Sequence, residues 1–316
     1  MERLWDDRIV SDKAKKLLIG GYDIHVHGNP SYGPNCEGFE RDDFEIIRDG
    51  REAGLKGICI KNYEFTTVFR DYLVNKIEKQ NGYGSCRYFS SMTLNLPVGG
   101  INPFAADFAV QHGVKCIWFP TYSAQTWELQ FGWSVFDGYS KDIKYRESLS
   151  LRHPSNGRGI FIFDENGTLI PEAYEIIEIA KAGNVAIATG HLSAKESYAL
   201  CKAAIDMSHK KVILTHPDNG YTLMNLDMIR SLAGMGVYIE KTFFSHVNNH
   251  SPERAFGLVK EVGAEHFFMV SDTGHPWMLR PVKALGVMVD EYLNNGFAEE
   301  EVRSMVASNP EFLMLG

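Results

Sequence analysis

The sequence predicts one α/β domain built as a (β/α)8 barrel, and three observations predict it. The chain has 316 residues of which 44% are hydrophobic, enough for one large core. From residue 20 onward, short apolar runs alternate with longer segments of helical period, which is typical of strand–helix units around a parallel sheet. The first run is followed by HGNPSYG, which lacks the glycine-rich turn of a doubly wound sheet. Eight such units in roughly 250 residues have the size of a (β/α)8 barrel.

Eight apolar runs predict the strands, and all are short enough for a barrel. They are residues 22–27, 57–61, 87–94, 114–120, 185–190, 211–216, 236–241 and 267–272. The segments between them predict crossover helices, several of which begin with Ser, Thr or Pro and end in Gly. These segments are residues 42–54, 66–80, 171–183, 193–208, 222–235, 251–263 and 279–296.

One interval, residues 120–170, is too long for a simple connection between the fourth and fifth strands. It is rich in aromatic residues, namely Trp127, Phe131, Trp133, Phe136, Tyr139 and Tyr145. Such an insertion indicates a lid, a binding loop or a contact between the subunits of a homo-oligomer. The first twenty residues predict an added helix and residues 298–308 a C-terminal helix, so a single domain is expected to cover residues 1–316.

Charge and composition exclude several classes of function. The net charge of −8 and the absence of Lys/Arg runs argue against nucleic acids and anionic membranes as partners. The first twenty residues mix charges throughout, and no run is long enough to span a bilayer, so we expect a cytoplasmic protein. The five cysteines are scattered without a C-x-x-C pair, which favours reduced thiols.

Polar residues gather where the predicted strands end. In a parallel barrel, the carboxyl ends of the strands form one common mouth that carries catalytic side chains. Six of the eight runs end in a residue that can ionise or bind a metal: His25 and His27, Lys61, His191, His216, Glu240 and Asp272.

His25 and His27 lie two residues apart on a strand, so their side chains point to the same side and can share one ion. Each of the other residues alone could be a capping or hydrogen-bonded polar group, as Asp272 before Thr-Gly could be. Together, four histidines and an aspartate suit Zn²⁺, Mn²⁺ or Fe²⁺, and the lack of thiolates favours a catalytic site. The ion would acidify a bound water, and Asp272 would accept the proton of that water and later donate it to the leaving group.

At these residues the chain resembles the amidohydrolase superfamily of metal-dependent (β/α)8 hydrolases. His25, His27, His191, His216 and Asp272 match the superfamily pattern in order and spacing, and the closing SNPEFLMLG resembles its C-terminal segment. The likeness covers residues 20–316, and DENGTLIPEAYEIIEIA, ATGHLS, LTHPDN and KNYEFT look like an uncharacterised branch related to phosphotriesterase-like and dihydroorotase-like enzymes.

The resemblance implies one or two ions per chain. His25, His27 and Asp272 would hold the first, and His191 with His216 the second. A carboxylated lysine on strand four bridges the two ions in binuclear members, but strand four here ends CIWFPTY. Lys61 on strand two is the nearest substitute; it is either carboxylated, or an amine that contacts substrate, or part of a salt bridge. Glu64 is a second bridging candidate.

The leading hypothesis is therefore a zinc-dependent hydrolase that acts on a small-molecule amide, cyclic amide, lactone or ester. Glu240, His275 and Trp277 are candidate substrate contacts, although each also has an ordinary structural interpretation. Because strand four lacks its lysine, a mononuclear decarboxylase of the same superfamily is an alternative. A phosphoester hydrolase and a barrel that only binds ligands are further alternatives.

Overall fold

The computed structural model describes residues 7–31, 38–131, 159–220, 222–248 and 252–316. Its strands are all paired in parallel, in two sheets of order β1-β2-β3 and β4-β5-β6-β7-β8-β9. Every predicted strand run is confirmed as a strand, although the strands are shorter than the runs. They are β1 (Tyr22–Val26), β2 (Gly57–Ile60), β3 (Arg87–Phe89), β4 (Ser91–Thr93), β5 (Cys116–Trp118), β6 (Ala186–Ala188), β7 (Val212–Leu214), β8 (Tyr238–Thr242) and β9 (Phe267–Val270).

The third predicted strand is divided at Ser90, where the chain changes partner from β2 to β5. Between β2 and β4, side chains replace the backbone ladder. The Ser91 hydroxyl donates to the Ile60 carbonyl at 2.7 Å, and the Ser91 N–H donates to the Thr67 hydroxyl at 2.8 Å. The boundary between the two sheets is thus joined by hydroxyl groups.

Beyond the ladders, hydrogen bonds also join β1 to the chain that follows β9. The Asp272 N–H donates to the His25 carbonyl and the His27 N–H to the Thr273 carbonyl, both at 2.9 Å. The Ser271 N–H donates to the Asp23 carboxylate at 3.0 Å. These bonds hold His25, His27 and Asp272 side by side, whereas a fully closed barrel remains a prediction because no ladder runs between β1 and β9.

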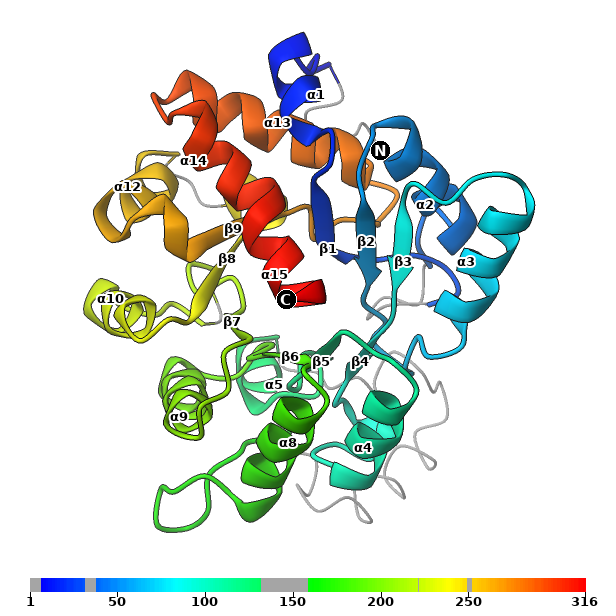
Figure 1. Cartoon of the computed structure of the whole chain (residues 1–316). Helices are drawn as coiled ribbons and strands as arrows, with labels where there is room; N and C mark the ends of the chain where they lie inside the picture. Colours follow the sequence, from blue (N-terminus) through cyan, green and yellow to red (C-terminus); the bar gives the residue numbers. More distant parts are fainter. Residues whose placement is uncertain (1–6, 32–37, 132–158, 221, 249–251) are drawn as a thin grey trace.

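The predicted crossover helices are present, and Figure 1 shows them outside the strands. They are α2 (Asp43–Glu52), α3 (Arg70–Gln80), α8 (Pro171–Ala182), α9 (Ala194–Asp206), α10 (Leu226–Gly234), α12 (Pro252–Val262) and α13 (Pro281–Asn294). Capping boxes begin two of them, at Asp42 with Glu45 and at Ser193 with Glu196. Three further helices were not predicted: α4 (Pro103–Gln111), α5 (Gln125–Phe131) and α11 (Phe243–Asn248). Asn102 caps α4 and Pro103 begins it.

Helices at both chain ends complete the fold. The expected N-terminal helix is confirmed as α1 (Asp12–Leu18). The C-terminal helix is longer than predicted, because α14 (Glu299–Arg303) continues through a π-helical turn (Ser304–Ser308) into α15 (Asn309–Leu315). None of the helices in the described ranges is long and apolar enough to cross a membrane.

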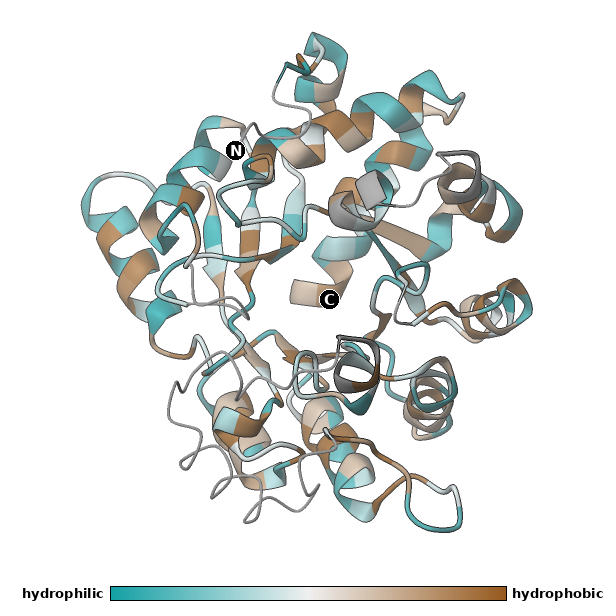
Figure 2. Cartoon of the chain, turned by 180° about the vertical axis from the view of Figure 1, so that it is seen from behind, coloured by the Kyte–Doolittle hydropathy of each residue, from teal (hydrophilic) through white to brown (hydrophobic). Residues whose placement is uncertain are grey.

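The core consists of two main layers. Most buried apolar residues form a layer between the strands and the surrounding helices. A second cluster among the strands includes Ile24, Trp118 and Phe268, and it also takes in Leu313 and Met314 of α15. Figure 2 shows brown and teal segments alternating along the outer helices, as expected of helices with one face toward the core. Since Tyr22, at the start of β1, donates to Glu311 of α15 at 2.7 Å, this helix lies at the amino ends of the strands, opposite the predicted mouth.

The insertion between β5 and β6 is described only at its ends. A bridge between Ala124 and Ile160 brings these ends together. Of the aromatic residues singled out there, Trp133, Phe136, Tyr139 and Tyr145 lie outside the described residues. The expectation of a lid, a binding loop or a subunit contact is therefore untested.

Candidate metal centre

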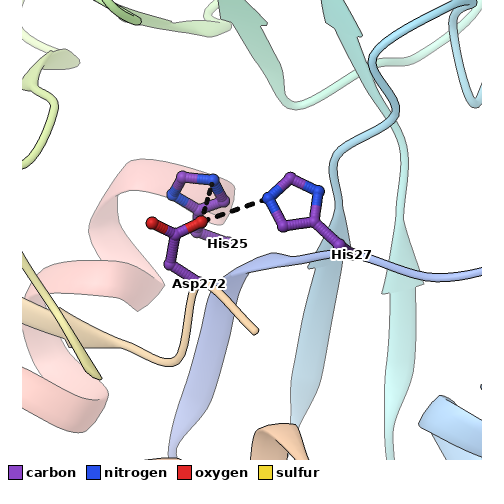
Figure 3. A group of neighbouring side chains, drawn as sticks. All are labelled: His25, His27 and Asp272. Carbon is purple, nitrogen blue, oxygen red and sulfur yellow. Dashed lines mark hydrogen bonds and ion pairs between the residues drawn. The ribbon is translucent and has the colours of Figure 1, made fainter. Parts of the chain in front are cut away.

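Three of the predicted ligands come together at the carboxyl ends of β1 and β9. Figure 3 shows His25 and His27 directed at the carboxylate of Asp272. The Oδ1 atom of Asp272 lies 3.0 Å from His25 Nε2 and 3.1 Å from His27 Nε2. Both histidines are fully buried, and one ligand atom from each of the three residues lies within 4.8 Å of the others.

The second nitrogen of each imidazole is already engaged. His25 Nδ1 lies 2.9 Å from Oε1 of Glu240, and His27 Nδ1 lies 3.1 Å from the backbone carbonyl of Lys61. Carboxylate and carbonyl oxygens only accept hydrogen bonds here, so each Nδ1 carries the proton and each Nε2 presents a lone pair. The two Nε2 lone pairs and the Asp272 carboxylate oxygen converge, and the Lys61 amine and the Tyr63 hydroxyl are the donors that reach them. The two imidazoles and the carboxylate fit a divalent metal ion with nitrogen and oxygen ligands.

The sequence predicted Glu240 as a candidate substrate contact, with an ordinary structural role as the alternative. In the structure its side chain is fully buried beneath the histidines. Its Oε1 accepts from His25, and its Oε2 accepts from the His216 N–H at 3.2 Å. Both carboxylate oxygens thus orient metal-site histidines, a position below the site rather than at its mouth.

Lys61 directly follows β2 and is 1% exposed. Its Nζ lies 3.0 Å from His25 Nε2 and 4.6 Å from the ring centre of Trp118. Burial lowers its pKa, while the charges of Asp272 and Glu240 act in the opposite direction. The amine therefore lies at the metal-binding face of His25, within reach of any ligand bound there.

His191 and His216 lie next to the three-residue cluster. Their rings are 5.2 Å apart, and the His216 ring is 6.3 Å from that of His25. Burial lowers the pKa of His191, and lowers that of His216 to about 4, so both are neutral at pH 7. Gly190 precedes His191 with φ +62°, and a Cβ there would collide with the Phe119 carbonyl, so glycine brings His191 close to strand β5.

Backbone conformation at two ligands is unusual. His216 has φ +23° and Asp272 has φ +50°, the left-handed region that non-glycine residues rarely adopt. Both are residues at the end of a strand, where the chain turns sharply. Strain of this kind clusters at functional sites.

The remaining candidate residues, His275, Trp277 and Glu64, lie around the cluster of His25, His27 and Asp272. His275 and Trp277 stack with ring centres 5.3 Å apart, and His275 also contacts Phe39, which itself stacks on His27 at 5.4 Å. These two residues thus reach the cluster through Phe39. Glu64, the second bridging candidate, accepts a hydrogen bond from Ser31 at 2.6 Å.

Sequence reasoning missed two tyrosines. The Tyr63 hydroxyl lies 2.8 Å from His27 Nε2, and Tyr122 donates to it at 3.2 Å. Both side chains are buried, and their rings contact at 4.3 Å. Their position was the available signal, because each follows a predicted strand by a few residues, in KNYEFT and in FPTY.

Comparison with known proteins adds one assignment at the level of sequence. A model of a family of unknown function, DUF6282, matches residues 20–240, which include His25, His27, Lys61, His191, His216 and Glu240. The chain belongs to the DUF6282 family. No curated protein matches its sequence.

Solved structures share the fold of this DUF6282 member at low identity. An amidohydrolase from Pseudomonas aeruginosa has a TM-score of 0.60 and 12% identity, with 95% of this chain and 98% of that chain covered. A 2,6-dihydroxybenzoate decarboxylase from Rhizobium has a TM-score of 0.54 and 10% identity over 94% and 98%. A mutant organophosphorus hydrolase from Deinococcus radiodurans has a TM-score of 0.51 and 12% identity over 94% of both chains. At such identities the likeness concerns the α/β fold.

Proposed function

We propose that this DUF6282 protein is a metal-dependent hydrolase that acts on a small-molecule amide, cyclic amide, lactone or ester. One observation carries the proposal. Two imidazole lone pairs, fixed by acceptors at Nδ1, converge with a carboxylate oxygen at 3.0 and 3.1 Å. Two neutral imidazoles and a carboxylate in this arrangement can hold a cation.

In this proposal His25, His27 and Asp272 hold one ion, and His191 with His216 hold a second if the centre is binuclear. Nitrogen and oxygen ligands without thiolates suit zinc first, with manganese and iron as alternatives. Such an ion supplies a more acidic water and polarises the oxygen of the substrate. Asp272 accepts a proton from the attacking water and returns it to the leaving group.

The tyrosines give the protein a hydrogen-bond donor beside the metal ligands. Because Tyr122 donates to Tyr63, the hydroxyl proton of Tyr63 is left to point at His27 Nε2 or at an oxygen of a bound substrate. Phe39, Tyr122 and Trp127 pack around this hydroxyl as apolar walls. A small ring with a carbonyl group matches both features.

A decarboxylase remains the second candidate, and a specific observation favours it. The fourth predicted strand, β5, ends at Trp118, whose ring packs 4.4 Å from His25 where a bridging lysine would be expected. A centre with one ion, and with Lys61 as an uncarboxylated amine, would suit the decarboxylation of a substrate. A phosphoester hydrolase has less support, since Lys61 is the basic side chain at the described cluster. A ligand-binding barrel without catalysis would not require these ligands.

Metal content per chain tests the proposal. We would measure it by elemental analysis of wild type, Lys61→Ala and His27→Ala, each purified without added metal and again after metal is supplied. Two ions in wild type and fewer in Lys61→Ala indicate a carboxylated, bridging Lys61, and the hydrolase is then assayed with lactones, cyclic amides and phosphoesters. One ion in both favours the decarboxylase. No metal in wild type, or metal retained by His27→Ala, contradicts the proposed centre.

Four further expectations belong to this proposal. They are closure of the strands into a (β/α)8 barrel, a single domain over residues 1–316, a homo-oligomer and a cytoplasmic location. The hydrogen bonds between β1 and the residues after β9 support the first of these.

A further inference from the structure

Helices α3 and α4 carry large apolar side chains on their outer surface. We call these residues the α3–α4 patch: Phe69, Tyr72, Leu73, Phe104 and Phe108. Phe104 is 90% exposed and Tyr72 is 62% exposed. Phe69 and Leu73 are each 54% exposed and Phe108 is 46% exposed. A single exposed apolar residue is ordinary, but five on two neighbouring helices are not.

The patch is continuous across the two helices. The rings of Phe69 and Phe108 lie 6.2 Å apart in an edge-to-face arrangement. The exposed His112 ring contacts both, at 5.3 Å from Phe69 and 4.2 Å from Phe108. Figure 1 accordingly places α3 and α4 next to each other on the outside of the strands.

The area of the patch matches what a stable interface needs. With about 200 Å² for one aromatic side chain, the exposed fractions of its four aromatic residues amount to on the order of 500 Å². A standard interface covers about 800 Å² on each partner, of which slightly more than half is apolar. The patch alone therefore supplies the apolar part of one side of such an interface.

Spacing and charge indicate which partner fits. Phe104 and Phe108 of α4 form a ridge of residues four apart, the pattern by which helices pack on one another, and Phe69, the N-cap residue of α3, lies against this ridge. The exposed Lys76 of α3 and the half-buried Asp107 of α4 carry opposite charges on the same two helices. In a two-fold pairing that sets α3 of one copy against α4 of its partner, these charges attract each other, so the patch suits a second copy of this chain.

We propose that the α3–α4 patch is the contact surface between two copies of this chain, related by a two-fold axis. The interface lies on the outer surface of α3 and α4, whereas the candidate metal centre lies at the carboxyl ends of the strands. A partner on the patch therefore does not cover the centre. Formation of the dimer does not depend on bound metal or on the catalytic proposal.

Light scattering coupled to gel filtration tests the proposal on the full chain over a wide range of concentrations. Wild type should have twice the mass of the 35.6 kDa chain. Phe104→Asp should reduce the measured mass about twofold, because a charge on this side chain cannot be desolvated in the interface. Ile9→Asp is the matched control: Ile9 is 89% exposed near α1, outside the patch, and its dimer should persist.

A second pair of variants tests the arrangement. Lys76→Glu should weaken the dimer, and Lys76→Glu combined with Asp107→Lys should restore it. A wild-type chain that is a monomer at all concentrations would overturn the proposal. A dimer that survives Phe104→Asp, or a charge reversal that is not restored by the double variant, would also overturn it.

Discussion

Glu240 orients two candidate ligands through both of its carboxylate oxygens. It accepts hydrogen bonds from His25 Nδ1 and from the His216 backbone N–H. Glu240→Gln keeps one carbonyl acceptor but replaces the other oxygen by an amide nitrogen that cannot accept, and Glu240→Ala removes both acceptors. We expect metal affinity to fall about 10-fold in the first variant and about 100-fold in the second, as for other residues that orient ligating histidines.

Competition with a coloured chelator measures these affinities. Glu78→Gln is the matched control, since Glu78 is also buried but pairs with Arg51 between α3 and α2. Its metal affinity should equal that of wild type. Equal affinities for Glu240→Ala and wild type would mean that Glu240 has no part in orienting His25.

The buried histidines make stability depend on pH. Burial lowers the pKa of His209, His216, His246 and His275 to about 4, compared with 6.5 in the unfolded chain. Between these values the unfolded chain binds more protons than the folded one, so the free energy of unfolding falls as the pH is lowered. In metal-free protein we expect each such histidine to lower the free energy of unfolding by about 2 kcal/mol between pH 7 and 5, measured by urea unfolding.

His209 separates this effect from the metal site. It immediately precedes the start of the β7 region and is buried away from the ligands. His209→Gln should reduce the slope of the free energy of unfolding against pH, because one proton fewer is taken up on unfolding between pH 6.5 and 4. An unchanged slope would show that His209 keeps an ordinary pKa in the folded protein.

Among the elements, the joint between β2 and β4 depends on hydroxyl groups. Ser91→Ala leaves the buried Ile60 carbonyl without the 2.7 Å hydrogen bond from the Ser91 hydroxyl. The Thr67 hydroxyl, 3.4 Å from the same carbonyl, remains as a weaker donor. We therefore expect the free energy of unfolding to fall by about 1 kcal/mol, the net contribution of one hydrogen bond. Urea or guanidinium denaturation measures this loss.

Thr93 provides the control two residues further along the same strand. It is equally buried, but its hydroxyl makes no hydrogen bond with any described residue. Thr93→Val keeps the shape and should be neutral or stabilising. If Thr93→Val costs as much as Ser91→Ala, burial alone rather than the Ser91 hydrogen bond determines stability here.

These elements also indicate what sequence can predict. The strand runs were predictable because buried parallel strands require continuous apolar, β-branched residues, as in KVILTH. The break at Ser90 was not, because it depends on Thr67, which is distant in sequence. α4 was not predicted, although Asn102 and Pro103 are favourable residues at the start of a helix.

At the scale of the whole molecule, α15 covers the amino ends of the strands with Leu313 and Met314. Leu313→Ala should lower the free energy of unfolding by about 2–5 kcal/mol, because the side chain is fully buried among the strands. Leu315→Ala, two residues on and 46% exposed, should change it by less than about 0.5 kcal/mol. Equal effects in a denaturant titration would contradict the position of α15.

The molecule as a whole explains why much of the site could be predicted. Parallel strands bring their carboxyl ends to one place, so residues at six strand ends were expected to meet, and His25, His27 and Asp272 do. Contacts made by loops were not predictable in this way. The hydrogen bond of Tyr63 to His27 and the exposed Phe104 depend on paths of the chain that no periodicity encodes.

Lys61 contacts both histidines of the first strand, one through its side chain and the other through its backbone. Its amine reaches His25, whereas its backbone carbonyl accepts from His27 Nδ1. The main-chain contact does not depend on the side chain at position 61, so a substitution there can change the charge beside His25 and still leave His27 Nδ1 its acceptor.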